Sequence, residues 1–174
     1  MAQNVPERPQ LRRLSLEFTL HYSPFIMSLK LYLDCCALQR PFYDRSQLRV
    51  ATEAEAILKL FEEFETGVIE ITSSDVLLLE LNQIELSPRR TYCINLLAKS
   101  SYFVELTDSI EALAISYSEL GIKTADALHL ASAVEGKADY FCSCDDRFIR
   151  KAQVIETGLT KVVSVLELVP KLEL

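Results

Sequence analysis

The chain has 174 residues, of which 49% are hydrophobic and 25% are charged, and its formal net charge is −7. This length and composition predict one globular domain with a full core and exclude a disordered chain. The negative charge argues mildly against non-specific nucleic-acid binding, which normally depends on neutralising phosphates, but it is compatible with a contact that metal ions bridge.

Cysteine content and hydropathy predict a cytoplasmic protein. The chain has five cysteines, an odd number, without a C-x-x-C pair, which fits a reducing compartment better than a disulfide framework. No apolar run approaches the roughly 18 residues that span a bilayer. Arg12 and Arg13 precede a segment that Glu17 interrupts, so the start of the chain is a poor signal peptide. We therefore expect no membrane association.

Residues 1–27 differ in pattern from the rest of the chain. They have mixed polarity and no sustained hydrophobic period, and the first apolar strand comes only after Met27. We interpret residues 1–27 as an N-terminal extension, with Met27 as a candidate natural initiator, and residues 28–174 as the domain. An N-terminal arm that packs on the domain is an equally open alternative.

Apolar patterning predicts an alternation of strands and helices. Buried strands are predicted at 29–35, 68–72, 102–106, 139–143 and 161–165. Apolar residues at helical spacing predict helices at 48–66, 76–86, 89–99, 109–120, 124–135 and 146–152. Gly67 is predicted to end its helix, Gly136 to form a tight turn, and Asp108 or Ser109 to cap a helix. The alternation indicates a parallel sheet covered on both faces by helices, which is the α/β class.

Four carboxylates occupy positions where such a fold binds ligands. Asp34 lies at the carboxyl end of one predicted strand and Asp145 follows another, and ligands bind beyond the carboxyl ends of parallel strands. Asp126 lies in the first turn of a predicted helix, and Glu80 interrupts an apolar helix. Taken singly, each also has a structural interpretation, such as helix capping. Together, four converging like charges would repel one another unless a cation lay between them.

Hard divalent ions fit this set of side chains. Mg²⁺ prefers oxygen ligands and keeps several waters while it binds a few carboxylates and a substrate phosphate. Such ions activate water and stabilise the attacking and leaving oxygens of a phosphodiester displacement.

Four segments, LYLDCCAL, DVLLLELNQ, KTADALHLASA and ADYFCSCDDRF, resemble the acidic motifs of PIN-domain nucleases. The resemblance covers about residues 28–169 and is closest to the small bacterial ribonucleases that act as toxins in toxin–antitoxin pairs. It implies a flavodoxin-like α/β/α sandwich with a mainly parallel sheet, and an endoribonuclease that depends on Mg²⁺ or Mn²⁺. It places four residues at the family's catalytic and metal-binding positions, with Ser143 in support: Asp34, Glu80, Asp126 and Asp145.

The first motif departs from the family. A small hydroxyl residue commonly follows the first aspartate there, but Cys35 and Cys36 follow Asp34 here. A thiol is a weak hydrogen-bond partner, so the expected support of Asp34 is poor on that side. Cys142 and Cys144 also stand near a strand end, but the spacing of the four cysteines lacks the usual zinc-binding clips. We interpret them mainly as buried cysteines.

Other residues near the motifs have two interpretations each. His129 is interpreted as a packed core histidine rather than a catalytic one. Lys123 and Arg147 could contact phosphates or be ordinary surface charges. Asp146 is either a further ligand or an exposed neighbour.

The predicted function is therefore metal-dependent hydrolysis of RNA, with the role of a toxin favoured. The open alternatives are a catalytically silent PIN-like module for protein interaction, a DNA-directed nuclease and an RNA-processing nuclease. The expected partners are an RNA substrate and, for a toxin, a protein antitoxin; a homodimer is left open.

Overall fold

The computed structural model describes residues 28–172. The predicted extension at 1–27 lies outside the described residues. The strands are Leu29–Leu33 (β1), Ile69–Ile71 (β2), Ser73–Ser74 (β3), Phe103–Val104 (β4), Tyr140–Ser143 (β5) and Lys161–Ser164 (β6).

Four of these strands form a parallel sheet in the order β2-β1-β5-β6. Leu31 pairs with Ile71 of β2, and Leu33 pairs with Cys142 of β5, so β1 has a neighbour on each side. The side chains from Leu31 to Leu33 have no exposed surface, because helices cover both faces of a parallel sheet. The predicted parallel sheet is confirmed.

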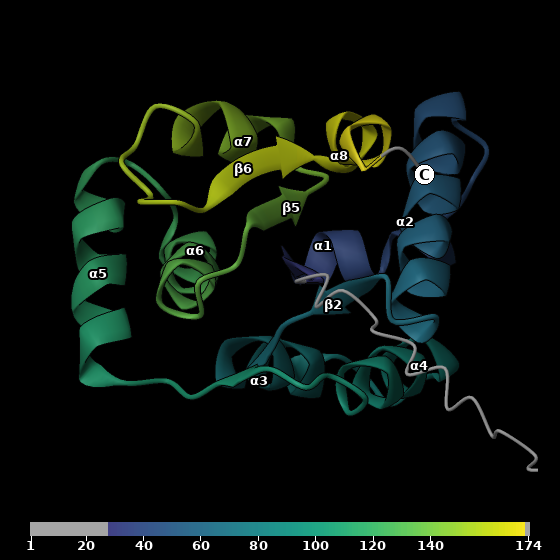
Figure 1. The fold of residues 1–174 in the computed structure, drawn as a ribbon, viewed down its shortest axis with the longest axis horizontal. Helices are drawn as coiled ribbons and strands as arrows, with labels where there is room; N and C mark the ends of the chain where they lie inside the picture. Colours follow the sequence, from purple (N-terminus) through teal and green to yellow (C-terminus); the bar gives the residue numbers. More distant parts are fainter. Residues whose placement is uncertain (1–27, 173–174) are drawn as a thin grey trace, which may run out of the picture.

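The helices are Cys35–Leu38 (α1), the 3₁₀ turn Arg40–Phe42 (η1), Leu48–Glu65 (α2), Asp75–Gln83 (α3), Pro88–Leu97 (α4), Asp108–Glu119 (α5), Thr124–Glu135 (α6), Asp146–Ala152 (α7) and Val165–Lys171 (α8). Helices α2 and α8 lie on one side of the sheet, and α6, with α5 outside it, lies on the other (Figure 1). This is an α/β/α sandwich, as expected. No helix within residues 28–172 is long and apolar enough to cross a membrane.

One predicted strand is wrong in its extent and in its place. The segment predicted at 102–106 forms only the two residues of β4, which pair with β3 in a separate two-stranded sheet. Phe103 is 50% exposed, so the segment is apolar without lying in the core. Apolar alternation alone does not distinguish such an edge from a central strand.

Helix ends follow local chemistry, with one correction. Gly67 ends α2 with φ +77°, as predicted. The predicted turn at Gly136 is present at the end of α6; within it Lys137 takes the left-handed conformation with φ 54°, while Gly136 has φ −71°. A glycine is needed at position 136 because a side chain would not fit there: its Cβ would lie 2.6 Å from Cγ2 of Val104. Helix α5 is capped by Thr107, whose hydroxyl accepts from a backbone N–H, rather than by the next two residues.

The patterning misses two short helices. Helix α1 is a single turn capped by Asp34, too short to show a hydrophobic period. Helix α8 begins with a capping box between Ser164 and Glu167. Pro170 lies inside this helix, and because proline normally ends or kinks a helix, the sequence does not indicate one here.

Candidate metal centre

Two neighbouring strands each deliver an aspartate at the carboxyl edge of the sheet. Asp34 follows the last residue of β1, and its backbone N–H donates to the carbonyl of Cys142 at 3.3 Å. Strand β5 ends at Ser143, and Asp145 lies two residues beyond it. Because β1 and β5 are parallel neighbours, both aspartates lie at the edge where α/β folds bind ligands.

Asp34 is held by its own helix turn. Its Oδ1 accepts the backbone N–H of Ala37 at 2.8 Å and the thiol of Cys36 at 3.0 Å. Burial raises the pKa of Asp34 well above its ordinary value, and the nearby Cys36 raises it further. The sequence predicts poor support of Asp34 on this side; the structure supplies that support through the thiol of Cys36.

Asp145 caps helix α7. Its Oδ1 accepts the backbone N–H groups of Arg147 and Phe148, at 2.8 Å and 3.2 Å. Ser143 is fully buried, and its Oγ accepts the backbone N–H of Asp145 at 3.0 Å. Ser143 therefore fixes the backbone that carries the carboxylate. Within residues 28–172, Oδ2 of Asp145 accepts no hydrogen bond, which leaves that oxygen available to a cation.

Asp146 forms an ion pair with an arginine. Arg49 of α2 binds both of its carboxylate oxygens, with two N–O distances of 2.5 Å. This pair lowers the pKa of Asp146. Arg49 also donates to the buried Glu53 at 2.8 Å. A bidentate arginine fixes the carboxylate, so the structure favours Asp146 as an ion-pair partner over a further metal ligand.

A cavity of about 390 Å³ is bordered by the start of α6 and by α7. Asp126 and Asp145 both line it. Four basic side chains line it too: Lys123, Arg147, Arg150 and Lys151. Carboxylates can hold a divalent ion, and ammonium and guanidinium groups can bind phosphate. The cavity therefore combines the two kinds of group that a metal-bridged phosphate needs.

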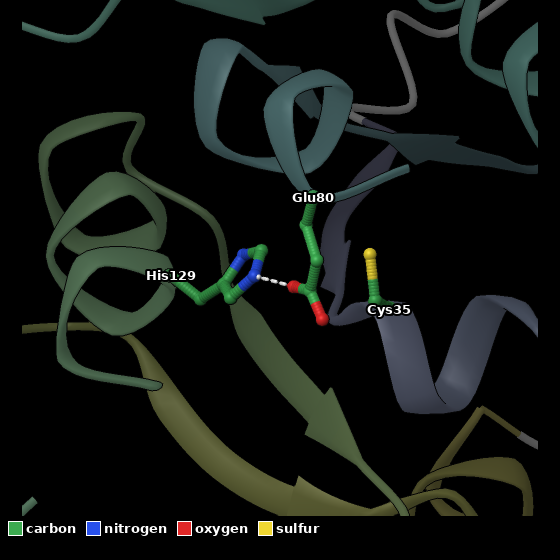
Figure 2. A group of neighbouring side chains, drawn as sticks. All are labelled: Cys35, Glu80 and His129. Atoms are coloured by element: carbon green, nitrogen blue, oxygen red, sulfur yellow. Dashed lines mark hydrogen bonds and ion pairs between the residues drawn. The ribbon is translucent and has the colours of Figure 1, made fainter. Parts of the chain in front are cut away.

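Glu80 reaches the same region from helix α3. It lies between His129 of α6 and Cys35 at the start of α1 (Figure 2). Nε2 of His129 lies 2.5 Å from Oε2 of Glu80, and this hydrogen bond lowers the pKa of Glu80. Glu80 and His129 line a second cavity, of about 290 Å³, together with Ala125. Ala125 directly precedes Asp126, so the two cavities adjoin the same first turn of α6.

A buried polar chain continues from Glu80 into the core. Nδ1 of His129 lies 2.9 Å from the hydroxyl of Tyr32, which lies 2.8 Å from Oγ of Ser74. Ser74 accepts the backbone N–H of Leu77 at 3.1 Å, so its own hydroxyl proton can go to Tyr32. Tyr32 then donates to Nδ1. This direction leaves the proton of the neutral ring on Nε2, where it can be donated to Glu80.

The charges of the region influence one another. Burial raises the pKa of Asp126; Lys123 lowers it, while Asp145 and Glu80 raise it. Burial also raises the pKa of Cys35, and the charges of Glu80 and Asp34 add to that effect. Repulsion of this kind is what a bound cation relieves. With oxygen ligands in the majority, these residues fit a hard divalent ion such as Mg²⁺ or Mn²⁺.

The four candidate carboxylates are not gathered into one tight cluster. Asp126 and Asp145 share a cavity, Glu80 lines the adjoining one, and Asp34 lines neither of these two. Among the residues that the structure describes, one group has three potential ligand atoms all within 4.8 Å of one another: Cys35, Glu80 and His129. A single ion held by all four carboxylates stays a prediction.

Sequence reasoning missed the partners of Glu80. His129 is only 3% exposed, as a packed histidine should be, but both of its ring nitrogens are hydrogen-bonded. His129 follows Asp126 by three residues, which places both on one helical face. This spacing is the sequence feature that could have placed His129 beside the site. Nothing in the sequence pairs His129 with Tyr32 or with Cys35, because helical spacing gives a face and not its tertiary neighbours.

Comparison with protein families identifies a PIN domain in the chain. Its model matches residues 32–154, from β1 to just past the end of α7, and this range contains all four candidate carboxylates. Comparison with curated proteins finds no match. PIN domains are in general metal-dependent nucleases. Since the match covers more than half of the chain, and the fold is the one expected, the protein belongs to the PIN domain family.

Proposed function

We propose that this protein is a metal-dependent endoribonuclease that hydrolyses RNA phosphodiester bonds. The observation that carries the proposal is the cavity in which Asp126 and Asp145 lie beside four basic side chains. Anionic side chains alone would repel RNA, and basic ones alone would bind it without cleavage. The two together suit a phosphate that a metal ion bridges to the protein.

The residues divide into three roles. Asp126 and Asp145 would hold the ion from the cavity, and Asp34 and Glu80 would hold it or stabilise it electrostatically from the sheet edge and from α3. Ser143 positions Asp145 through its backbone. The bound Mg²⁺ or Mn²⁺ would supply an activated water and stabilise the oxygens of the displacement.

Basic side chains orient the substrate in this proposal. Lys123 and Arg147 stand closest in sequence to the two cavity aspartates and line the same cavity. They contact the phosphates on either side of the scissile bond, which is a task that suits ammonium and guanidinium groups. Since backbone phosphates carry little sequence information, the choice of RNA target lies in other contacts.

The experiment is cleavage of single-stranded RNA by the full chain. We expect cleavage with Mg²⁺ or Mn²⁺, none with EDTA, and a loss of at least about 10²-fold in rate for Asp126→Asn, because phosphoryl chemistry depends on electrostatic stabilisation. Asp108→Asn is the matched control: Asp108 is an exposed aspartate in the first turn of α5, and its replacement should leave the rate unchanged.

Three outcomes decide between this function and its rivals. Equal cleavage by wild type and Asp126→Asn, or cleavage in EDTA, contradicts the nuclease. No cleavage of any nucleic acid with either ion favours a module for protein interaction. Faster cleavage of single-stranded DNA than of RNA assigns a DNA-directed nuclease.

The physiological role that we propose is that of a toxin controlled by a protein antitoxin. It is supported by the resemblance of the four acidic motifs to toxin ribonucleases. Expression of the wild-type chain in bacteria should arrest growth, and expression of Asp126→Asn should not. Growth unaffected by a chain that cleaves RNA in vitro would assign an RNA-processing nuclease instead.

A further inference from the structure

A second kind of metal chemistry is available beside the carboxylates. Cys35, Glu80 and His129 each offer one ligand atom, and these atoms lie within 4.8 Å of one another. They come from three different helices, α1, α3 and α6, and converge on one point (Figure 2). The group is therefore made by the fold rather than by a local sequence motif.

The donor atoms favour a softer ion than Mg²⁺. Thiolate, imidazole and carboxylate are together the ligands of Zn²⁺, whereas Mg²⁺ prefers oxygen throughout. Zinc binding would release the thiol proton of Cys35 to solvent, and the resulting thiolate and the carboxylate carry two negative charges, which the divalent ion neutralises. Three protein ligands with one open position are typical of zinc sites that stay accessible to solvent.

The surroundings of the three residues are also those of a zinc site. Nδ1 of His129 is hydrogen-bonded to Tyr32 at 2.9 Å, and such a partner orients the ring of a metal-binding histidine. Cys35 is only 3% exposed and fixed at the start of α1. The side chain of Glu80 is 45% exposed, which gives an ion a route of entry and a place for a water ligand.

Only a small rearrangement is needed. Tetrahedral bonds of about 2.0–2.3 Å place the ligand atoms of zinc about 3.3–3.8 Å apart. Nε2 of His129 and Oε2 of Glu80 now lie 2.5 Å apart because they share a proton. An ion would replace that proton, and the half-exposed Glu80 can move to accommodate it. The ring proton then passes to Nδ1, where Tyr32 can accept it, since a hydroxyl both donates and accepts.

We propose that Cys35, Glu80 and His129 form a Zn²⁺ site with three protein ligands and one open position. Glu80 also holds or stabilises the catalytic ion in the proposed function, so zinc at this site withdraws Glu80 from the nuclease centre and slows RNA cleavage. This regulatory consequence rests on the proposed function, whereas zinc binding itself does not.

Binding is tested with Co²⁺ as a spectroscopic substitute for Zn²⁺ on the full metal-free chain. We expect the intense near-ultraviolet absorption of a cobalt–thiolate bond, its displacement by one equivalent of Zn²⁺, and its loss in Cys35→Ala. Cys93→Ala is the matched control, because Cys93 is an equally buried cysteine in α4 that contacts the carbonyl of Leu38 instead. Absence of the band in the wild type, or its persistence in Cys35→Ala, overturns the site.

A second variant tests the site even if Cys35→Ala does not fold. Glu80→Gln keeps the shape of a half-exposed side chain and removes one ligand charge, and it should lower the affinity for Zn²⁺ at least about tenfold. Zn²⁺ should raise the unfolding temperature of the wild type, because it binds the folded state, and raise that of Glu80→Gln less. Equal zinc affinities for the two proteins contradict the site even if Cys35→Ala does not fold.

The regulatory consequence has its own readout. With Mg²⁺ present, one equivalent of Zn²⁺ should slow RNA cleavage at least about tenfold in wild type and in Cys93→Ala, and less in Cys35→Ala, each relative to its own rate without zinc. A cobalt–thiolate band without inhibition keeps the site and removes its regulatory role. A band on a chain that cleaves no RNA keeps the site while the proposed nuclease fails.

Discussion

The hydroxyl of Tyr32 and Nδ1 of His129 lie 2.9 Å apart, and this contact joins a central strand of the sheet to the helix that carries Asp126. Tyr32 has no exposed surface, and its ring stacks on Phe141 of β5 with centroids 5.5 Å apart. The position of α6, and with it that of Asp126, therefore depends in part on one buried hydroxyl.

Removing that hydroxyl should destabilise the protein. Tyr32→Phe keeps the ring but leaves Nδ1 of His129 and Oγ of Ser74 short of a buried partner, which costs about 1–3 kcal/mol. The measurement is urea unfolding. Tyr140→Phe is the control, because the hydroxyl of Tyr140 forms no hydrogen bond in the described part of the chain; its change should stay within about 0.5 kcal/mol. Equal losses in both variants would contradict the role of the polar chain through His129.

Asp34→Asn should stabilise the metal-free protein at neutral pH. Because the pKa of Asp34 is raised in the folded state, its contribution to stability is fully present below the unfolded pKa of about 3.9 and is lost as pH rises through the folded pKa. Asparagine does not ionise, and its side-chain oxygen can still accept from Ala37. Unfolding free energies from pH 4 to 8 in chelator should show the advantage of the variant growing with pH. An advantage independent of pH would contradict the raised pKa.

Gly136→Ala should destabilise the protein through a clash rather than through its backbone. The new Cβ would lie 2.6 Å from Cγ2 of Val104 and 3.0 Å from the carbonyl oxygen of Ser132, and overpacking of this kind costs about 1–3 kcal/mol. Gly67→Ala is the comparison, since it meets no atom within 4 Å but has φ +77°. Adding Val104→Ala should restore part of the stability only in the Gly136 variant, as a double-mutant cycle will show.

The adjacent residues Asp145 and Asp146 should differ in metal binding. Asp145→Asn should lower the affinity for Mn²⁺ at least about tenfold, because it removes charge from the cavity shared with Asp126. Asp146→Asn should change it little, since Arg49 already occupies both oxygens of Asp146. Calorimetric titration with Mn²⁺ measures both affinities. A larger loss of Mn²⁺ affinity for Asp146→Asn than for Asp145→Asn would make Asp146, and not Asp145, the metal ligand.

The sequence was sufficient for the features that local chemistry determines. Helix α6 occupies Thr124–Glu135, as its small apolar residues at helical spacing predict, and Asp145 caps α7 as a helix-start residue should. Asp34 and Asp145 reach the same edge of the sheet because parallel strands must end together.

Long-range partners were beyond the sequence. Glu80 and His129 are 49 residues apart, and a hydrophobic period states which face of a helix is buried but not what it meets. Cys35 and Cys36 predict weak support for Asp34, yet the second thiol provides that support. The direction of the Cys36 thiol depends on the single helical turn of α1. That turn is too short to show a hydrophobic period, so the sequence does not predict it.

The pairing of β1 also bears on the order in which the chain can fold. Its two neighbours are β2 and β5, and the contact between Lys30 and Asp139 at the β5 side joins residues 109 positions apart. During synthesis, β1 can meet β2 long before β5 has left the ribosome. Until then one edge of a mostly apolar strand stays open to other chains, which exposes the nascent protein to aggregation. We therefore expect slow folding, limited by this late pairing, because non-local strand contacts form last.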